Sequence, residues 1–379
     1  MRQNINIIII GADTVNTLGL IRSVGIEGAR PNVIVSTRYS KAWISRSKYI
    51  RSITIARSES DILQAIHSYK KAGCDNYLIP SSDPASIILD KHYQELSKEF
   101  LLPNCGEKTG GVIENLRTER MLQTARAAGL ETPKQYDTET LKAMITAGED
   151  LEGSDYPLFV KCLKAETNGK SFHIIHNRAE LVDIFKNADT KEILIQEFID
   201  IEEELGIQGV AFGAEKEAYV PAVIHKIRTS SIAKGSTVYA RLSENPDIQK
   251  IVRRYINATG YDGIFDVELM RSKNKLYFIE CNFRNGAYGF AYTKAGFNLP
   301  MIWIDRQSPA KSAPVKDSFT LMNEYSDFLQ MRHGSCKPWT WVRQFLCADV
   351  LLTVNGKDMR PAIDRIAIKQ KLHSKNDDI

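Results

Sequence analysis

Acidic, amide and guanidinium side chains alternate near residue 280. Two β-rich runs flank a short polar turn within Gly263 to Tyr288, and this pattern predicts a β-hairpin. In the second run, Glu280, Asn282 and Arg284 fall on one face of the strand. Burying these charged and polar side chains costs free energy unless other groups form hydrogen bonds or ion pairs with them. The plainer alternative is a solvated hairpin face with a surface salt bridge.

Glu268, on the first run, can join that face only in one hairpin register. Direct pairing of Ser272 with Lys275 would set Glu268 opposite Ile279. We therefore predict an odd-membered turn, which places Glu268 across from Glu280 or two residues along. Two carboxylates and an amide oxygen would then converge on one point, and Mg²⁺ prefers such oxygen ligands. The neighbouring guanidinium would hold a carboxylate or a phosphate.

The composition is that of a soluble globular protein, with 25% charged and 43% hydrophobic residues. A chain of 379 residues fits two or three α/β domains or lobes. The net charge of +4 is mild, which argues against a dedicated nucleic-acid binder and fits a protein that holds a polyanionic small molecule. The apolar run Ile7–Ile10 is far too short for a signal peptide or a membrane span, so no membrane partner is expected. The six cysteines show no metal-ligand spacing, which predicts reduced thiols and a cytoplasmic location.

Strand and helix patterns alternate in residues 1–105 and predict a small doubly wound, Rossmann-like domain. Ligands of such sheets bind at the carboxyl ends of the strands, where Asp13, Ser82 and Asp83 lie. Helix capping explains these three side chains equally well. The expected strands are Ile5–Ile10, Val33–Ser36 and Tyr77–Pro80, and the expected helices are Thr17–Val24, Ser60–Ala72 and Ile87–Leu96.

A lysine among apolar neighbours marks a later strand, Tyr156 to Lys164. The loop that follows, up to Ser171, contains glycine and small polar residues, and another strand begins at Phe172. Such a loop is a flap whose backbone N–H groups can close over phosphates, with Lys161 supplying a point charge. The alternative is an ordinary hairpin with a lysine that extends from the strand edge into water.

A further predicted strand, Glu192 to Ile199, leads into the acidic cluster Glu202–Glu204 and the strand Gly206–Gly213. Backbone groups at the end of such a strand can contact the edge of a purine, and a nearby carboxylate can accept bonds from ribose hydroxyls. By itself, an acidic cluster is more often a solvated turn.

Taken in this order, the motifs resemble those of the ATP-grasp superfamily over roughly Arg117 to Pro300. The resemblance implies a nucleotide held between two lobes built on antiparallel sheets. It implies a pre-ATP-grasp domain at residues 1–105 and an ATP-grasp domain at 106–309, with a small flap lobe at about 132–200. The residues that carry it are Lys161, the flap Glu166–Ser171, Gln196–Ile199, Glu204, Glu268 and Glu280–Arg284.

The resemblance also implies how the nucleotide is bound. Glu197 and Ile199 would bond adenine through their backbones, Glu204 would hold ribose, and Lys161 would bind phosphate. The family's first phosphate lysine, expected at the head of the helix at 117–128, is absent, and either Arg117 or Arg120 could replace it. The expected nucleotide contacts are Arg117, Arg120, Lys161, Lys164, Gly169, Ser171, Gln196, Glu197, Phe198, Ile199 and Glu204.

For the metal site, the resemblance implies that Glu268, Glu280 and Asn282 hold Mg²⁺, expected as two ions, with Mn²⁺ an option. Within the superfamily, the chain looks most like the carboxylate–amine ligase branch that includes D-aspartate ligases. This likeness is carried by Arg228, Lys234–Thr237, Gly260–Gly263 and Ala295–Pro300.

We therefore expect an ATP-dependent ligase that forms an amide or peptide bond through an acyl phosphate and releases ADP and phosphate. The expected catalytic residues are Arg284, Arg228 and Lys161, and the expected substrates are an amino-acid-like carboxylate and an amine. Two alternatives stay open. One is a bicarbonate-activating enzyme similar to biotin carboxylase or carbamoyl phosphate synthase, and the other is a nucleotide-binding protein without turnover. The sequence does not set the oligomeric state, and a homodimer is one option.

The last predicted region, residues 310–379, is a helical extension with a disordered tail from Lys369. Within it, Pro338 to Val354 is amphipathic and carries tryptophan. We expect this stretch to pack as a helical cap on the ATP-grasp domain rather than to bind a partner.

Overall fold

The computed structural model describes residues 4–151, 153–162, 172–214, 216–230, 236–307, 316 and 319–367. The chain divides into two compact units, and each is described by itself. The larger unit comprises Met1–Gly129, Glu204–Leu269 and Ile279–Ile379, and the smaller comprises Leu130–Glu203 and Met270–Phe278. No helix in the described part of the chain is both long enough and apolar enough to cross a membrane.

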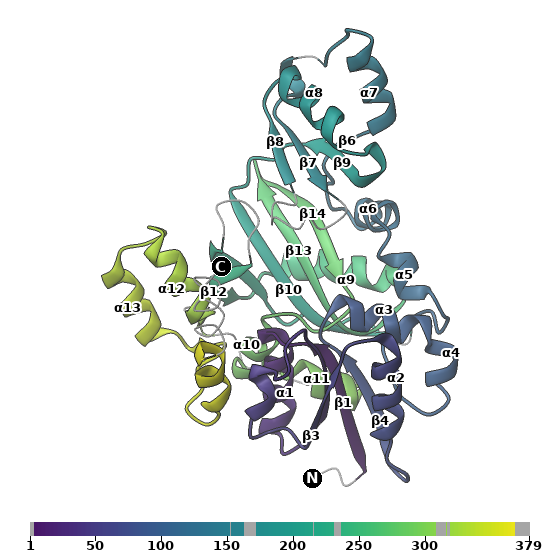
Figure 1. The fold of residues 1–379 in the computed structure, drawn as a ribbon, viewed down its shortest axis with the longest axis vertical. Helices are drawn as coiled ribbons and strands as arrows, with labels where there is room; N and C mark the ends of the chain where they lie inside the picture. The colour runs from purple at the N-terminus through teal and green to yellow at the C-terminus, as the bar shows by residue number, and fades with distance from the viewer. Residues whose placement is uncertain are drawn as a thin grey trace. The chain divides into compact units, whose positions relative to one another are not determined.

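A parallel four-stranded sheet opens the larger unit, with the strands in the order β3-β2-β1-β4 (Figure 1). The even-numbered isoleucines of β1 face one apolar cluster with α2 and α3, and the odd-numbered ones face another with α1. Helices on both faces make the domain doubly wound, as predicted. The strands are β1 (Ile5–Ala12), β2 (Asn32–Ser36), β3 (Ser52–Ala56) and β4 (Asp75–Pro80), and the helices are α1 (Val15–Ile26), η1 (Trp43–Arg46), α2 (Glu59–Ser68), α3 (Asp83–Lys91) and α4 (Tyr93–Leu96).

Three polar residues at the strand ends of this sheet have structural partners. Asp13 accepts hydrogen bonds from the backbone N–H groups of Trp43 and Ile44. Ser82 caps α3, as the capping alternative predicted. Asp83, at the first position of the same helix, bonds a side chain of the second sheet, described below.

The second sheet of the larger unit is mostly antiparallel, in the order β14-β13-β10-β11-β12-β15-β16. Its strands are β10 (Glu203–Phe212), β11 (Val223–Thr229), β12 (Thr237–Ser243), β13 (Tyr261–Ser272), β14 (Lys275–Asn282), β15 (Phe319–Met322) and β16 (Val350–Leu351), and β5 (Asn104–Cys105) pairs with β13. The other helices of this unit are α5 (Gly111–Asn115), α6 (Thr118–Ala127), α9 (Pro246–Thr259), α10 (Gly289–Lys294), α11 (Leu299–Asp305), α12 (Glu324–Arg332) and α13 (Pro338–Cys347).

One continuous apolar cluster joins the two sheets of the larger unit. It contains Ile9 of β1 and Leu18 of α1, together with Ile224, Ala240 and Ile264 of the second sheet. The predicted domain boundary at residue 105 thus falls inside a single packed unit. The fold is a mixed α/β fold, as predicted.

The C-terminal region is not purely helical, which corrects the prediction for residues 310–379. The short apolar strand β15 pairs with β12 and covers an edge that would otherwise be open, and β16 pairs with β15. Both strands are so short that they give little periodic signal in the sequence. The predicted helix at 338–354 is α13, which ends at Cys347. The predicted tail from Lys369 lies outside the described residues.

The smaller unit is a four-stranded sheet in the order β6-β9-β7-β8, with α7 and α8 on one face (Figure 1). Leu158 and Val160 of β7 pack against Leu141 of α7 and Leu181 of α8. The opposite face carries no helix among the described residues of this unit. The elements are β6 (Gln135–Tyr136), α7 (Thr138–Thr146), η2 (Gly153–Asp155), β7 (Leu158–Cys162), β8 (Phe172–Ile175), α8 (Arg178–Asn187), η3 (Thr190–Glu192) and β9 (Ile193–Glu197).

A buried arginine on α1 ties the C-terminal segment to the N-terminal sheet. The Arg22 side chain is fully buried, and its Nε lies 3.0 Å from Asp358 Oδ2. The guanidinium also donates to the carbonyl oxygens of Leu352, Thr353 and Asp358. Asp358 in turn accepts from Ser47 Oγ at 2.8 Å. Each buried charge therefore has several partners, as a buried ion pair requires.

Arg22→Met should lower the free energy of unfolding by about 3–5 kcal/mol, because it leaves the Asp358 carboxylate buried without its countercharge. Arg46→Met is the matched control. Arg46 is half exposed and lies 3.5 Å from Asp364, so its removal should cost less than about 1 kcal/mol. Urea unfolding of both variants measures the difference, and equal losses would contradict the assigned role of Arg22.

Candidate functional site

The hairpin at the predicted metal site has a two-residue turn, so the prediction of an odd-membered turn is wrong. Strand β13 ends at Ser272 and β14 begins at Lys275. Lys273 and Asn274 between them both have positive φ angles, of 47° and 63°. This is the geometry of a type I′ turn, which matches the twist of a hairpin better than a longer loop.

Two contacts lie just beyond the end of β14, which is Asn282. Tyr261 and Phe283 pack together, with their ring centroids 4.8 Å apart. Arg284 Nη1 donates to Asp266 Oδ2 at 3.1 Å. Because Phe283 and Arg284 follow the strand, these contacts do not set the register between β13 and β14.

Glu280 and Asn282 lie two residues apart on β14, and Glu268 lies on the neighbouring strand β13. Asn282 Nδ2 donates to Glu280 Oε1 at 3.2 Å, so these two side chains share a face of their strand. The Glu268 side chain is one-quarter exposed.

Lys226 is a site residue that the motifs did not indicate. Its Nζ lies 2.7 Å from Glu268 Oε2 and 3.1 Å from Glu204 Oε2, and only 4% of its side chain is exposed. Strands β10 and β11 pair Leu205 with His225, which sets Glu204 opposite Lys226. The one sequence signal was a charged residue within the apolar run that begins at Val223.

The pKa of Lys226 is raised despite its burial. Burial alone would lower that pKa, but electrostatic interaction with Tyr288, Glu268 and Glu204 and the hydrogen bond to Glu268 outweigh the loss of hydration. The ammonium is therefore held charged between two carboxylates. Among the described residues, no group of three or more His, Cys, Asp or Glu side chains is arranged around a common point for a metal.

Arg284 lies between two carboxylates in the larger unit. Its Nε is 2.8 Å from Asp83 Oδ1, and its Nη1 is 3.1 Å from Asp266 Oδ2. Burial raises the pKa of Asp266 to about 7, against the opposing effect of Arg284. Asp83 is the first residue of helix α3, and its carboxylate also pairs with Arg284. It therefore combines a position at the helix start with an ion pair to the second sheet.

Arg228 lies on the other face of the sheet from Lys226, away from Glu268. Lys226 pairs with Ala240 and Arg228 pairs with Tyr239, so one extra residue, Ile227, bulges out between them. The bulge reverses the direction of the next side chain, that of Arg228, and a second irregularity follows between Arg228 and Thr229. The structure does not bring Arg228 together with the predicted metal residues.

The partners of Arg228 come from the C-terminal helices. Its Nε and Nη2 donate to the two carboxylate oxygens of Asp327, at 2.9 and 2.6 Å. Its Nη1 donates to Gln344 Oε1 at 2.8 Å, and its guanidinium lies 4.6 Å from the centre of the Tyr239 ring. Because Asp327 is fully buried, this is an internal ion pair rather than an open anion site.

The predicted nucleotide residues Lys161, Gln196 and Glu197 all lie on the small sheet. Lys161 is exposed and pairs with Phe172 of β8, on the face opposite α7 and α8. Phe159 and Gln196 pair on the same face. This face therefore combines the exposed cation of Lys161 with an amide and the rings of the buried Phe159 and the half-buried Phe172, a set that suits a base and phosphates.

The backbone near Glu197 is partly committed to its own sheet. The N–H of Glu197 donates to Lys134 O at 2.9 Å, and the N–H of Phe198 donates to Pro157 O at 3.2 Å. Both N–H groups are therefore used within the protein and are not available to donate a hydrogen bond to adenine. Ile199 is the next residue along the chain. Glu204, predicted to bind ribose, belongs to the larger unit and bonds Lys226.

The remaining predicted nucleotide contacts fall in three places. Arg117 precedes the first residue of α6 and Arg120 lies in its first turn, and both are exposed. The flap residues Lys164, Gly169 and Ser171 lie outside the described residues, as do Lys234 and Gly235 of the branch motif.

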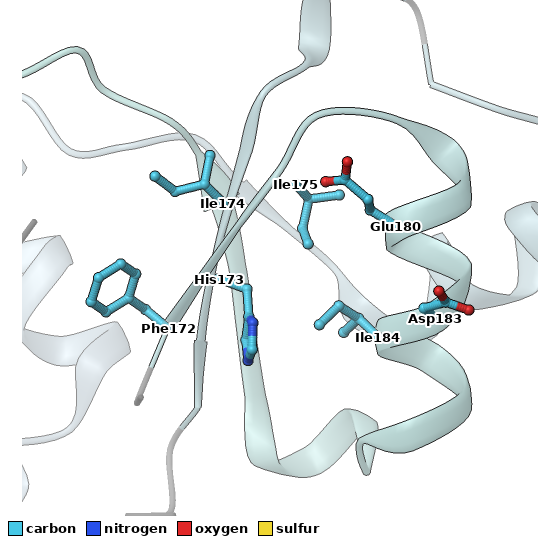
Figure 2. Close-up of a pocket in the computed structure, with 7 residues that line it drawn as sticks. All are labelled: Phe172, His173, Ile174, Ile175, Glu180, Asp183 and Ile184. Carbon is cyan, nitrogen blue, oxygen red and sulfur yellow. The ribbon is translucent and has the colours of Figure 1, made fainter. Parts of the chain in front are cut away.

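A hollow of about 450 Å³ lies beside the edge strand of the small sheet (Figure 2). Phe172 and Ile174 of β8 point away from α8, and Ile175 points toward it. Glu180 and Asp183 of α8 form the acidic wall. No predicted site residue lines this hollow, and the acidic wall does not suit a phosphate.

Comparison with known proteins identifies the family of the central region. Residues 123–295 match the model of the ATP-grasp domain. Among curated proteins, the chain is similar to N5-carboxyaminoimidazole ribonucleotide synthase of Staphylococcus aureus, with 23% identity over 233 residues, or 60% of each chain. It is also similar to formate-dependent phosphoribosylglycinamide formyltransferase of Wolinella succinogenes, with 26% identity over 162 residues, or 41% of each chain. The chain thus spans about 60% of the length of the first of these relatives.

Solved structures of low sequence identity share the fold. The N5-carboxyaminoimidazole synthetase of Staphylococcus aureus in complex with ADP aligns with a TM-score of 0.63 and 18% identity, covering 87% of this chain and 86% of that one. The L-amino acid ligase of Bacillus licheniformis aligns with a TM-score of 0.61 and 16% identity, covering 84% and 79%. These likenesses show a shared fold, and the match to the ATP-grasp domain concerns residues 123–295.

Proposed function

We propose that the protein is an ATP-dependent carboxylate–amine ligase. One observation carries the proposal: within the region that matches the ATP-grasp domain, Glu280 and Asn282 lie together on β14, and the partly exposed Glu268 lies on the neighbouring strand β13.

The donor set fits Mg²⁺. Two carboxylates and one amide oxygen are hard ligands, and Mg²⁺ commonly takes one or two carboxylates with water and phosphate oxygens completing its shell. Glu268, Glu280 and Asn282 would hold the cation, which would neutralise the negative charge that develops on the transferred phosphoryl group. Mn²⁺ has the same ligand preference and would serve as a substitute.

The proposed reaction follows from the weakness of a carboxylate as an acyl donor. Transfer of the γ-phosphoryl group of ATP to the carboxylate gives an acyl phosphate, and the amine then displaces phosphate to form the amide. Such transfer depends on positioning and on charge stabilisation more than on covalent help. Lys161 would bind the phosphates, and Arg284, fixed by Asp83 and Asp266, would orient the acyl group.

Bicarbonate activation is the second candidate, and the comparisons favour keeping it. The curated relative with 60% coverage is named as a carboxyaminoimidazole ribonucleotide synthase, whereas the L-amino acid ligase is named for amino acids. Both kinds of reaction can use the same metal-binding residues. The residues that bind the substrates therefore decide between them.

The assay that separates these candidates is ADP release by the purified protein with Mg²⁺ and ATP. Release that requires both an amino acid and an amine supports the ligase. Release that requires bicarbonate instead supports the second candidate. Nucleotide binding without release under any of these conditions would contradict both.

Glu280→Gln should reduce ADP release by roughly a hundredfold or more, because it removes one charge from the cation site without changing side-chain volume. Glu95→Gln is the control, since Glu95 is about two-thirds exposed in the N-terminal domain. Steady-state rates and thermal unfolding of both variants are compared with those of the wild-type protein. Undiminished turnover of a folded Glu280→Gln variant would refute the metal assignment.

Arg228→Met should destabilise the protein and leave cation binding intact. It removes one partner of a buried ion pair, which costs about 3 kcal/mol in typical proteins. Urea unfolding gives the stability, and Mn²⁺ titration with a non-hydrolysable ATP analogue gives the binding. A stable variant that had lost cation or nucleotide binding would instead restore the active-site role expected from the sequence.

A further inference from the structure

Lys226 pairs with Glu268, a carboxylate that we assign to the divalent cation. The chain thus supplies its own positive charge at the proposed cation site. Its ammonium contacts Glu268 at 2.7 Å and Glu204 at 3.1 Å, and burial keeps water from competing for these bonds. Glu268 is also one of the two carboxylates assigned to the divalent cation. The same oxygen atoms therefore have two possible partners, one supplied by the chain and one from solution.

Lys226 and a divalent cation cannot both bind Glu268 without repelling each other. A divalent cation placed on Glu268 would lie within a few ångströms of the ammonium, and like charges at that range repel strongly at a site of low polarity. Glu204 alone would remain as a counterion for Lys226. The repulsion is relieved only if further negative charge arrives with the cation, and a polyphosphate supplies it.

Lysine is suited to such an exchange of partners. Its ammonium is a compact charge on a flexible four-carbon stem, so it can leave one oxygen for another without the fixed geometry that an arginine needs. The neighbouring bulge at Ile227, whose side chain is about half exposed, interrupts the strand directly after it. Glu268 is partly exposed, so an anion bound beside it is within reach of the same open margin.

We propose that Lys226 is a phosphate-binding residue that makes cation binding depend on the nucleotide. Without nucleotide, Lys226 neutralises Glu268 and Glu204 and keeps the affinity for the divalent cation low. With the polyphosphate and cation bound together, its ammonium moves to phosphate oxygens and releases Glu268 to the cation. The inference rests on the proposed ATP-dependent activity and assigns to this site a residue that the family motifs did not mark.

The test is Mn²⁺ titration of the full-length protein with and without a non-hydrolysable ATP analogue. Lys226→Met should bind Mn²⁺ about tenfold more tightly than wild type when nucleotide is absent, because Glu268 loses its internal partner. Adding the nucleotide should raise the Mn²⁺ affinity of Lys226→Met by a factor about tenfold smaller than the factor for the wild type. The nucleotide affinity should show the same reduced response to Mn²⁺, since coupling between two ligands is reciprocal. Lys226→Arg keeps the charge and should match the wild type without nucleotide.

Lys250→Met is the matched control, because Lys250 is exposed on α9. Thermal unfolding reports whether each variant is folded, and Lys226→Gln replaces the methionine variant if that one is not. A folded, uncharged variant with wild-type Mn²⁺ affinity and wild-type coupling would overturn the role of Lys226 and leave the ligase proposal standing. A wild-type protein that binds neither the analogue nor Mn²⁺ would overturn the proposed function, and the inference with it.

Discussion

Charge balance at the margin of one sheet face is the constraint on which the site depends. The apolar cluster of the larger unit is bordered by the carboxylates of Glu204 and Glu268. Carboxylates in such a place must be compensated. The single ammonium of Lys226 compensates both of them from within the chain. This leaves a site with excess negative charge, which favours a cation that arrives with its own anion.

An irregularity in the ladder between β11 and β12 decides which charged side chain of β11 reaches this cluster. The bulge at Ile227 leaves Lys226 beside Glu268 and Glu204 and sends Arg228 to the other face, where Asp327 fixes it. Loss of the bulged residue would exchange the faces of the residues on one side of it.

The sequence predicted the parts of the molecule that follow periodic patterns. The doubly wound N-terminal sheet and the caps of its helices follow from continuous apolar strands and from serine before a helix. Alternation along one strand is visible in the sequence, and it placed Glu280 and Asn282 on the same face of β14. The pairing between strands is not visible in the sequence, and the predicted odd-membered turn was wrong. Bulges carry no periodic signal, so Arg228 was expected in place of Lys226. The two short C-terminal strands were missed because two to four residues are too few to show alternation.

The most direct test of this account is a crystal structure with Mn²⁺ and a non-hydrolysable ATP analogue, with the metal located by anomalous scattering. We expect Mn²⁺ beside Glu268, Glu280 and Asn282, and Lys226 Nζ within hydrogen-bonding distance of a phosphate oxygen rather than Glu268. Metal bound elsewhere, or Lys226 still bonded to both carboxylates beneath a bound triphosphate, would contradict it.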